Sequence, residues 1–349
     1  MDSLFTVQKI KDLEIKNRIV LPPMVCFNFA DDNGFVSKAN IEHYEKMAKG
    51  GSGLIIVEAT CVNENGKLSM NQLGIWSNEH ISGLSKIAEV CHKNDSKVFI
   101  QLHHAGLRTP KVVNTDTMTS SDYNDGKISA RAMSKGEIHS IQEDFINAAI
   151  RAEKAGFDGV ELHGAHSYLL TQFFSTKVNK RTDEYGGNFE NRIRIAREII
   201  DGIKQNVGSS FVVGIRMGCN ENNLENSISM AKTFESMGID YIHVSTGFDN
   251  TPVDKKLPDD FPCNWIVYGG TIIKKNVNIP VIVVNSIKTA KQARYLTDNN
   301  LADFVAVGRA QLADYNFVNH IREEKDIIEC LECKPCSWFT DGRKCPRYA

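Results

Sequence analysis

Two histidines, His163 and His166, stand where an apolar run of strand-forming residues gives way to a loop. Two imidazoles at this spacing can donate hydrogen bonds to one oxygen atom and stabilise negative charge that develops on it. The same pair can instead ligate a metal ion, with Glu161 as the third ligand. A third interpretation is a pair of solvent-facing loop histidines without a role. The residue types favour binding of an oxygen and leave the other two interpretations open.

A second group of residues has the composition of an anion site. Asn285 and Ser286 follow one apolar run, and Gly308 and Arg309 follow the next along the chain. Backbone amides beside small residues can face a phosphate, and an arginine can add a bidentate contact. The alternative is a turn glycine followed by an arginine in a surface salt bridge. Phosphate binding is the favoured interpretation.

The cysteines are distributed unevenly. Of the nine, five are scattered singly, and the other four crowd near the C-terminus as Cys330, Cys333, Cys336 and Cys345. Their overlapping C-x2-C-x2-C spacing is typical of a [4Fe–4S] cluster, whereas zinc sites more often use two separate pairs. We therefore expect these four residues to bind an iron–sulfur cluster, with zinc and unligated thiols as the alternatives.

The composition limits the class of protein. The chain has 349 residues, 42% of them hydrophobic and 24% charged, which excludes a disordered or fibrous protein. A net charge of −2 gives no reason to expect nucleic acid or anionic lipid as a partner. There is no apolar stretch of about eighteen residues and no basic-then-apolar leader pattern at the N-terminus. We expect a cytoplasmic protein without a membrane span.

Eight short apolar runs, most of them followed by a helical pattern, predict eight strand–helix units. The predicted strands cover residues 17–24, 53–60, 97–104, 159–166, 211–218, 241–247, 281–286 and 304–310. Most are continuous apolar runs, which are typical of parallel strands covered on both faces. The first strand is not followed by the Gly-x-Gly-x-x-Gly of a doubly wound sheet. The pattern predicts an α/β fold, a TIM (β/α)8 barrel over residues 1–326, with a short Cys-rich tail over 327–349.

Local signals add detail to this barrel. Ser134 and Glu137 form a predicted capping box, and Gly156 ends the helix that follows. Two segments, 105–133 and 248–263, exceed normal loop length and are expected at the mouth of the barrel, where barrel enzymes keep their binding loops. Glu58 is the only carboxylate at a predicted strand end, so a glycosidase, which needs two facing carboxyl groups, is excluded.

The segment GFDGVELHGAHSYLLTQFFSTKVNKRTDEYGGNFENR (156–192) closely resembles the signature region of the Old Yellow Enzyme family of FMN-dependent oxidoreductases. The resemblance extends over the whole barrel, because KNRIVLPPM, GLIIVEAT, NQLGIWS, QLHHAG and VAVGRA occur in the order found in that family. It is strongest to the bacterial branch with the xenobiotic reductases and the barrel domains of 2,4-dienoyl-CoA reductase and trimethylamine dehydrogenase.

The resemblance implies that FMN lies across the barrel mouth. Flavin contacts then fall to Pro23, Met24 and Ala59 along the isoalloxazine, Gln101 at its pyrimidine edge, and Arg216 beside N1 and O2. A positive charge at Arg216 favours the reduced, anionic flavin. The phosphate of FMN matches the anion group Asn285, Ser286, Gly308 and Arg309.

The resemblance also implies a reaction, the NAD(P)H-driven reduction of an activated alkene. Reduced flavin N5 delivers hydride to the β-carbon of an alkene that carries an electron-withdrawing group. His163 and His166 hold the substrate's carbonyl or nitro oxygen, and Tyr168 protonates the α-carbon. NAD(P)H reloads the flavin at the same site.

Two other functions remain open at this point. The cysteine tail suggests an electron-transfer flavoprotein or dehydrogenase that works with an external electron-transfer partner through its cluster. A non-catalytic barrel that keeps FMN for structure is the third interpretation, and intact His163, His166 and Tyr168 argue against it. The sequence leaves open the substrate, the choice between NADH and NADPH, and assembly into a homo-oligomer.

Overall fold

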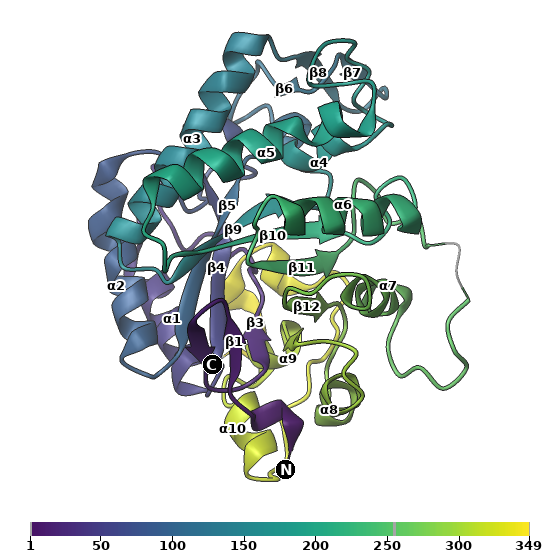
Figure 1. The fold of residues 1–349 in the computed structure, drawn as a ribbon. Coiled ribbons are helices and arrows are strands. Elements are labelled where there is room, and N and C mark those ends of the chain that lie inside the picture. The colour runs from purple at the N-terminus through teal and green to yellow at the C-terminus, as the bar shows by residue number, and fades with distance from the viewer. Residues whose placement is uncertain (1, 254–255, 349) are drawn as a thin grey trace.

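The computed structural model describes residues 2–253 and 256–348 and contains the predicted barrel (Figure 1). Eight parallel strands pair in chain order, and the last pairs with the first, Val305 opposite Ile19. They are β3 (Ile19–Leu21), β4 (Leu54–Cys61), β5 (Lys97–His103), β9 (Gly159–Gly164), β10 (Val212–Gly218), β11 (Tyr241–Ser245), β12 (Val281–Val284) and β13 (Phe304–Ala306). All eight predicted strands are confirmed.

Several predicted strands are too long at their carboxyl ends. The first ends at Leu21 because Pro22 and Pro23 follow, and proline has no amide hydrogen for a sheet ladder. The last two end before Asn285 and Gly308. These residues leave the sheet at the barrel mouth, where their backbone and side chains face the site described below.

Helices surround the strands on the outside of the barrel (Figure 1). The longer ones are α1 (Lys38–Lys49), α2 (Ile81–His92), α3 (Lys135–Lys154), α5 (Phe189–Asn206), α6 (Leu224–Ser236), α7 (Trp265–Lys274) and α8 (Ala290–Asp298). The shorter ones are α4 (Leu169–Phe174), α9 (Arg309–Ala313) and α10 (Phe317–Arg322). The predicted capping box is present, since Ser134 accepts the amide of Glu137 at the start of α3. Gly156, at φ +88°, follows the end of that helix as predicted.

An N-terminal hairpin was not predicted. It consists of β1 (Gln8–Ile10) and β2 (Leu13–Ile15), joined by a turn in which Lys11 has a φ of +56°. Ile10 and Ile15 are fully buried in one apolar cluster with residues from inside the barrel, including Leu54 and Phe304. The hairpin therefore completes the interior core, while a larger apolar cluster lies between the strands and the helices.

The two long segments at the mouth have different structures. The first, 105–133, contains a small sheet of β6 (Met118–Thr119), β7 (Tyr123–Asn124) and β8 (Ser129–Ala132), in the order β6-β8-β7. The second, 248–263, includes residues 254 and 255, which lie outside the described residues. Phe248 from the second segment packs with Tyr123 and Ile128 from the first. The two segments therefore share one apolar cluster at the mouth.

The tail returns to the barrel after α10. It contains two short 3-10 turns, Ser337–Phe339 and Gly342–Lys344. Trp338 is 2% exposed, and its Nε1–H donates to the carbonyl of Val25 at 2.8 Å. Its ring lies 5.9 Å from Phe29 and 5.2 Å from Tyr348. The tail is thus docked through aromatic contacts beside the segment that follows β3.

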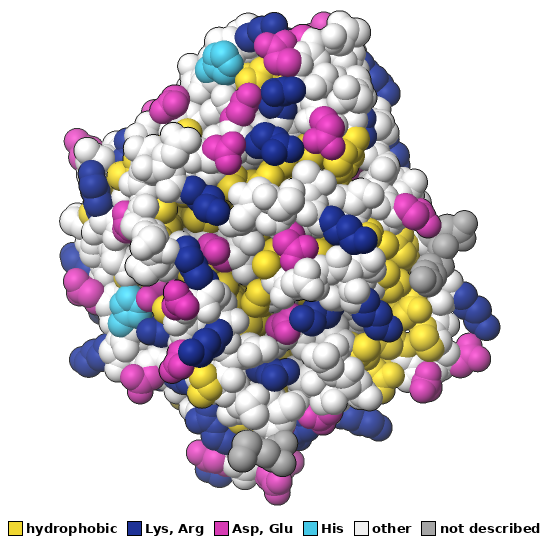
Figure 2. All heavy atoms as spheres, in the orientation of Figure 1, with side chains coloured by type: hydrophobic (Ala, Val, Ile, Leu, Met, Phe, Trp, Pro, Cys, Tyr) yellow, Lys and Arg dark blue, Asp and Glu magenta, His cyan; other side chains and the backbone are white. Residues whose placement is uncertain are grey.

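The surface seen in Figure 2 intersperses acidic and basic side chains, with hydrophobic side chains gathered toward the right, over α7. Within the described ranges, no helix combines the length and the apolar character needed to cross a bilayer.

Candidate active site

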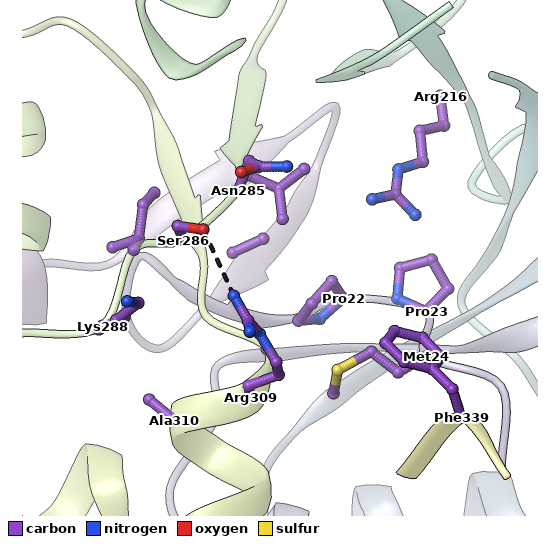
Figure 3. Close-up of a pocket in the computed structure, with 14 residues that line it drawn as sticks. Pro22, Pro23, Met24, Arg216, Asn285, Ser286, Lys288, Arg309, Ala310 and Phe339 are labelled. Carbon is purple, nitrogen blue, oxygen red and sulfur yellow. Dashed lines mark hydrogen bonds between the residues drawn. The ribbon is translucent and has the colours of Figure 1, made fainter. Parts of the chain in front are cut away.

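A cavity of about 300 Å³ opens where β3, β10, β12 and β13 end (Figure 3). Its walls include seven of the predicted site residues, Pro23, Met24, Arg216, Asn285, Ser286, Gly308 and Arg309. Chain closure of the barrel explains this, because parallel strands place their carboxyl ends at one face. The cavity is also lined by Lys288 and by Phe339 of the tail, to which the sequence analysis gave no role.

The end of the cavity near α9 has the features of an anion site. Arg309 Nη2 donates to Ser286 Oγ at 3.4 Å, and Figure 3 shows the guanidinium reaching from α9 toward Ser286. Asn285 and Ser286 have φ values of +125° and +51°, which non-glycine residues rarely adopt. Such backbone strain persists mostly at functional sites. A Cβ at Gly308 would lie 3.0 Å from the sulfur of Met24, so the close approach here favours glycine.

A buried polar network lies beside the cavity. Glu161 accepts hydrogen bonds from Gln101 Nε2 at 2.7 Å, Tyr241 Oη at 3.1 Å and His243 Nδ1 at 2.9 Å. Burial lowers the pKa of Arg216, and the charge of Glu161 opposes that effect. Gln101 Oε1 and Arg216 Nε are buried without a hydrogen-bond partner in the described part of the chain. Unpaired buried groups of this kind are costly, so their presence beside a cavity indicates a ligand.

Ala59 and Gln101 lie further inside than predicted. Ala59 is 3% exposed on β4, and its carbonyl accepts a hydrogen bond from Gln72 at 2.6 Å. Gln101 is fully buried on β5. Neither of them is among the residues that line the cavity.

His163, His166 and Tyr168 lie together at the end of β9. His163 Nε2 and His166 Nδ1 are 3.0 Å apart, so the two imidazoles bond to each other. The ring centroid of Tyr168 lies 4.9 Å from that of His163 and 4.4 Å from that of His103. His103 at the end of β5 is a further residue of this group, to which the sequence analysis assigned no role. His103 and His163 are distant in the chain, and only the barrel brings them into contact.

Burial determines the charge state of this group. It lowers the pKa of His163 and of His166 well below the usual value of 6.5, and the neighbouring Arg216 acts in the same direction. Both imidazoles are therefore neutral at neutral pH, and each carries one N–H. Burial raises the pKa of Tyr168, so its hydroxyl stays protonated. Neutral donors beside a protonated phenol suit the stabilisation of a developing oxyanion.

The metal interpretation of the histidine pair is wrong for this structure. The carboxylate of Glu161 is committed to His243, Tyr241 and Gln101 rather than to the pair. Within residues 2–253 and 256–348, no three His, Cys, Asp or Glu side chains are placed to hold a metal ion.

The same finding corrects the prediction for the tail. Cys330, Cys333, Cys336 and Cys345 do not come together as a ligand set for iron–sulfur or zinc. Cys336 and Cys345 instead pack, partly buried, against the core, on either side of the docked Trp338. The tail is held by aromatic packing rather than by a metal, so the spacing of the cysteines alone was misleading. These residues do not fit the predicted cluster.

The residues around the cavity do fit FMN. The anion site, Gly308 in close approach, and the unpaired buried atoms of Gln101 and Arg216 provide contacts for a phosphate at one end and a polar ring edge at the other. Pro23 and Met24 supply an apolar wall between them.

Comparisons with known proteins agree with this geometry. The NADH oxidase of Thermoanaerobacter brockii is 38% identical over 344 residues, which cover 95% of this chain and 52% of that protein. The chain thus spans about half the length of this relative. The NADPH dehydrogenase of Halalkalibacterium halodurans is 38% identical over 328 residues, covering 88% of this chain and 90% of its own.

Solved structures share the fold over nearly the full length. An Old Yellow Enzyme homologue from Zymomonas mobilis has a TM-score of 0.84 at 25% identity and covers 99% of both chains. Morphinone reductase has a TM-score of 0.80 at 25% identity, covering 94% of this chain and 91% of its own. The family model for NADH:flavin oxidoreductases and NADH oxidases matches residues 3–327. This chain therefore belongs to the NADH:flavin oxidoreductase / NADH oxidase family, a family of oxidoreductases to which the predicted resemblance pointed.

Proposed function

We propose that this protein is an FMN-dependent enzyme that uses NAD(P)H to reduce an electron-poor C=C bond in a small molecule. The observation that carries the proposal is the grouping of His163, His166 and Tyr168, two neutral imidazoles and a protonated phenol at one strand end. Relatives named NADPH dehydrogenase and a structural neighbour named morphinone reductase support the nicotinamide and the reductase parts.

The cofactor contacts follow from the cavity. Arg309, Ser286, Asn285 and Gly308 would hold the FMN phosphate, while Arg216 and Gln101 would meet the polar edge of the ring. Bound FMN supplies a two-electron carrier that takes hydride from NAD(P)H and gives it to the substrate. Arg216 faces this region with a buried positive charge, which favours an anionic ring.

The chain's own residues then act on the substrate. His163 and His166 donate hydrogen bonds to the oxygen of the electron-withdrawing group, so the charge that accumulates there as the β-carbon accepts hydride is stabilised. Tyr168 gives its proton to the α-carbon, which completes the addition of hydride and proton across the double bond. Phe248, Tyr123 and Ile128 form an apolar cluster at the mouth that excludes water from this step.

The direct test is conversion of a simple enone. Purified protein loaded with FMN should oxidise NADPH or NADH without oxygen only when 2-cyclohexen-1-one is added, with cyclohexanone as product by gas chromatography. A flavin-loaded protein that oxidises the nicotinamide in air but never converts this enone, a nitroalkene or a maleimide would refute the alkene part of the proposal.

We expect Arg309→Ala to weaken FMN binding by about tenfold to a hundredfold, the value of a charge-assisted hydrogen bond. Arg309→Lys should fall between the two, because lysine keeps the charge and loses the bidentate geometry. Titration of apoprotein with FMN, followed by quenching of flavin fluorescence, measures both. Equal affinities for wild type and Arg309→Ala would remove Arg309 from the phosphate site.

We expect the rate of enone reduction by the reduced enzyme to stay level between pH 6.5 and 10, the ordinary values for histidine and tyrosine that the items of this site leave behind. Lowered histidine pKa values mean that His163 and His166 become charged only below this range. A raised tyrosine pKa means that Tyr168 loses its proton only above it. Stopped-flow measurements of flavin reoxidation across this range check the prediction, and a rise or fall centred near pH 7 would contradict it.

A further inference from the structure

His163 and His166 belong to a longer chain of hydrogen bonds. His103 Nδ1 lies 3.1 Å from His163 Nδ1, and His163 Nε2 lies 3.0 Å from His166 Nδ1. His166 Nε2 lies 2.7 Å from Ser245 Oγ. Three imidazoles from β5, β9 and the turn after β9 are thus linked in series, and the chain ends on a serine from β11.

All three imidazoles in this chain are neutral. Burial lowers the pKa of His103 well below 6.5, as it does for His163 and His166. A neutral imidazole has one nitrogen that donates and one that accepts. Each bond in the chain needs one donor and one acceptor, so the position of the hydrogen on one ring determines its position on the next.

Only two hydrogen arrangements satisfy every bond. In the first, His103 Nδ1–H donates to His163, His163 Nε2–H donates to His166, and His166 Nε2–H donates to Ser245. In the second, every bond is reversed, and both rings of the pair carry hydrogen on Nδ1. The two arrangements differ at the free end, because His103 Nε2 is buried without a partner in the described chain.

The free end favours the first arrangement. The second would leave a buried N–H of His103 with no acceptor, whereas the first leaves only a lone pair there. Buried N–H groups without partners are among the rarest features of native structures. The first arrangement also leaves Ser245 Oγ as the acceptor that a substrate oxygen replaces at His166.

We propose that His103 is a positioning residue that fixes the hydrogen on Nε2 in both His163 and His166. Its Nδ1–H occupies His163 Nδ1, which obliges His163 to donate from Nε2 and His166 to do the same. The consequence for substrate binding rests on the proposed function, whereas the tautomers themselves do not depend on it. His103 thereby determines which nitrogens of the pair present hydrogen.

Nuclear magnetic resonance of the FMN-loaded enzyme tests this directly. With ¹⁵N-labelled histidine, two-bond ¹H–¹⁵N correlations distinguish a ring protonated on Nδ1 from one protonated on Nε2, and the His163 signals are assigned by their loss in His163→Asn. We expect Nε2–H on His163 in the wild type. His103→Phe keeps a ring against Tyr168 and removes the donor, so both tautomers of His163 should then be populated.

Two variants separate this role from a structural one. His103→Asn places an amide donor near the position of Nδ1 and should restore the Nε2–H signal, which mere loss of packing would not explain. His104→Asn is the matched control: the side chain of His104 accepts the Gly106 amide at 3.0 Å, and asparagine offers an acceptor in its place. This control should leave the His163 signals unchanged. It also keeps the test valid if His103→Phe folds poorly.

Binding of 4-chlorophenol, followed by the change in flavin absorbance, supplies the second readout. We expect about tenfold weaker binding in His103→Phe, at the low end for a partner that orients a histidine, and recovery in His103→Asn. Nδ1–H on His163 in the wild type, or a single unchanged tautomer in His103→Phe, would overturn the role of His103. A wild type that shows the expected tautomers but binds no phenol would overturn the proposed function instead.

Discussion

Replacing Tyr168 with phenylalanine is expected to slow enone reduction by about 100-fold to 10,000-fold, the usual contribution of a general acid. The ring that packs on His103 and His163 is kept, so only the proton donor is lost. Reduction of the flavin by NAD(P)H transfers hydride alone and should keep nearly its wild-type rate. Stopped-flow absorbance at the oxidised flavin band measures the two half-reactions separately.

A matched control for this variant is Tyr185→Phe. Tyr185 is also buried, and its hydroxyl donates to Glu198 at 2.7 Å, away from the cavity. Its loss should cost some stability and leave both half-reactions unchanged. If Tyr168→Phe reduced enones as fast as the wild type, the proton would have to come from another group, and the proposed role of Tyr168 would be lost.

The barrel was predictable because its signals are local and repeated. Each strand is a continuous apolar run, and the parallel arrangement that buries both faces leaves this signature in the sequence. The strand ends were less predictable, since Pro22 and Gly308 leave the sheet for reasons that depend on the ligand cavity. Once the strands are placed, closure of the barrel brings Asn285, Ser286 and Arg309 together without further information.

Contacts between distant side chains could not be predicted in the same way. The bond between His103 and His163 depends on the register of β5 against β9, and no local pattern in either strand specifies it. The hairpin over residues 8–15 was missed because its strands are only three residues each. Strands this short give too little alternation to be recognised.

The tail shows why cysteine spacing was a poor guide. A C-x2-C-x2-C pattern states which thiols can reach one ion and says nothing of what else holds the segment. Here Trp338 contacts Phe29, and His43 Nδ1 lies 3.0 Å from Tyr348 Oη, so an aromatic cluster docks the tail. Buried aromatic area on this scale can order a short segment without a metal.

This docking predicts a large effect for Trp338→Ala. Truncation of a buried tryptophan typically costs about 3–5 kcal/mol, and here the hydrogen bond to the Val25 carbonyl is lost as well. That cost is of the order of the net stability of a domain, so the tail should detach while the barrel stays folded. Amides around Trp338 and Tyr348 should then exchange hydrogen much faster, as measured by mass spectrometry of tail peptides.

The neighbouring residue provides the control. Phe339 is 65% exposed, so Phe339→Ala should leave tail exchange close to that of the wild type. Because Phe339 lines the cavity beside Met24, both variants should nevertheless weaken FMN binding, one by removing a wall and the other by releasing the segment that carries it. Tail peptides of Trp338→Ala that exchange as slowly as those of the wild type would show that other contacts hold the tail. Unchanged FMN affinity in both variants would show instead that the tail docks without forming part of the cofactor site.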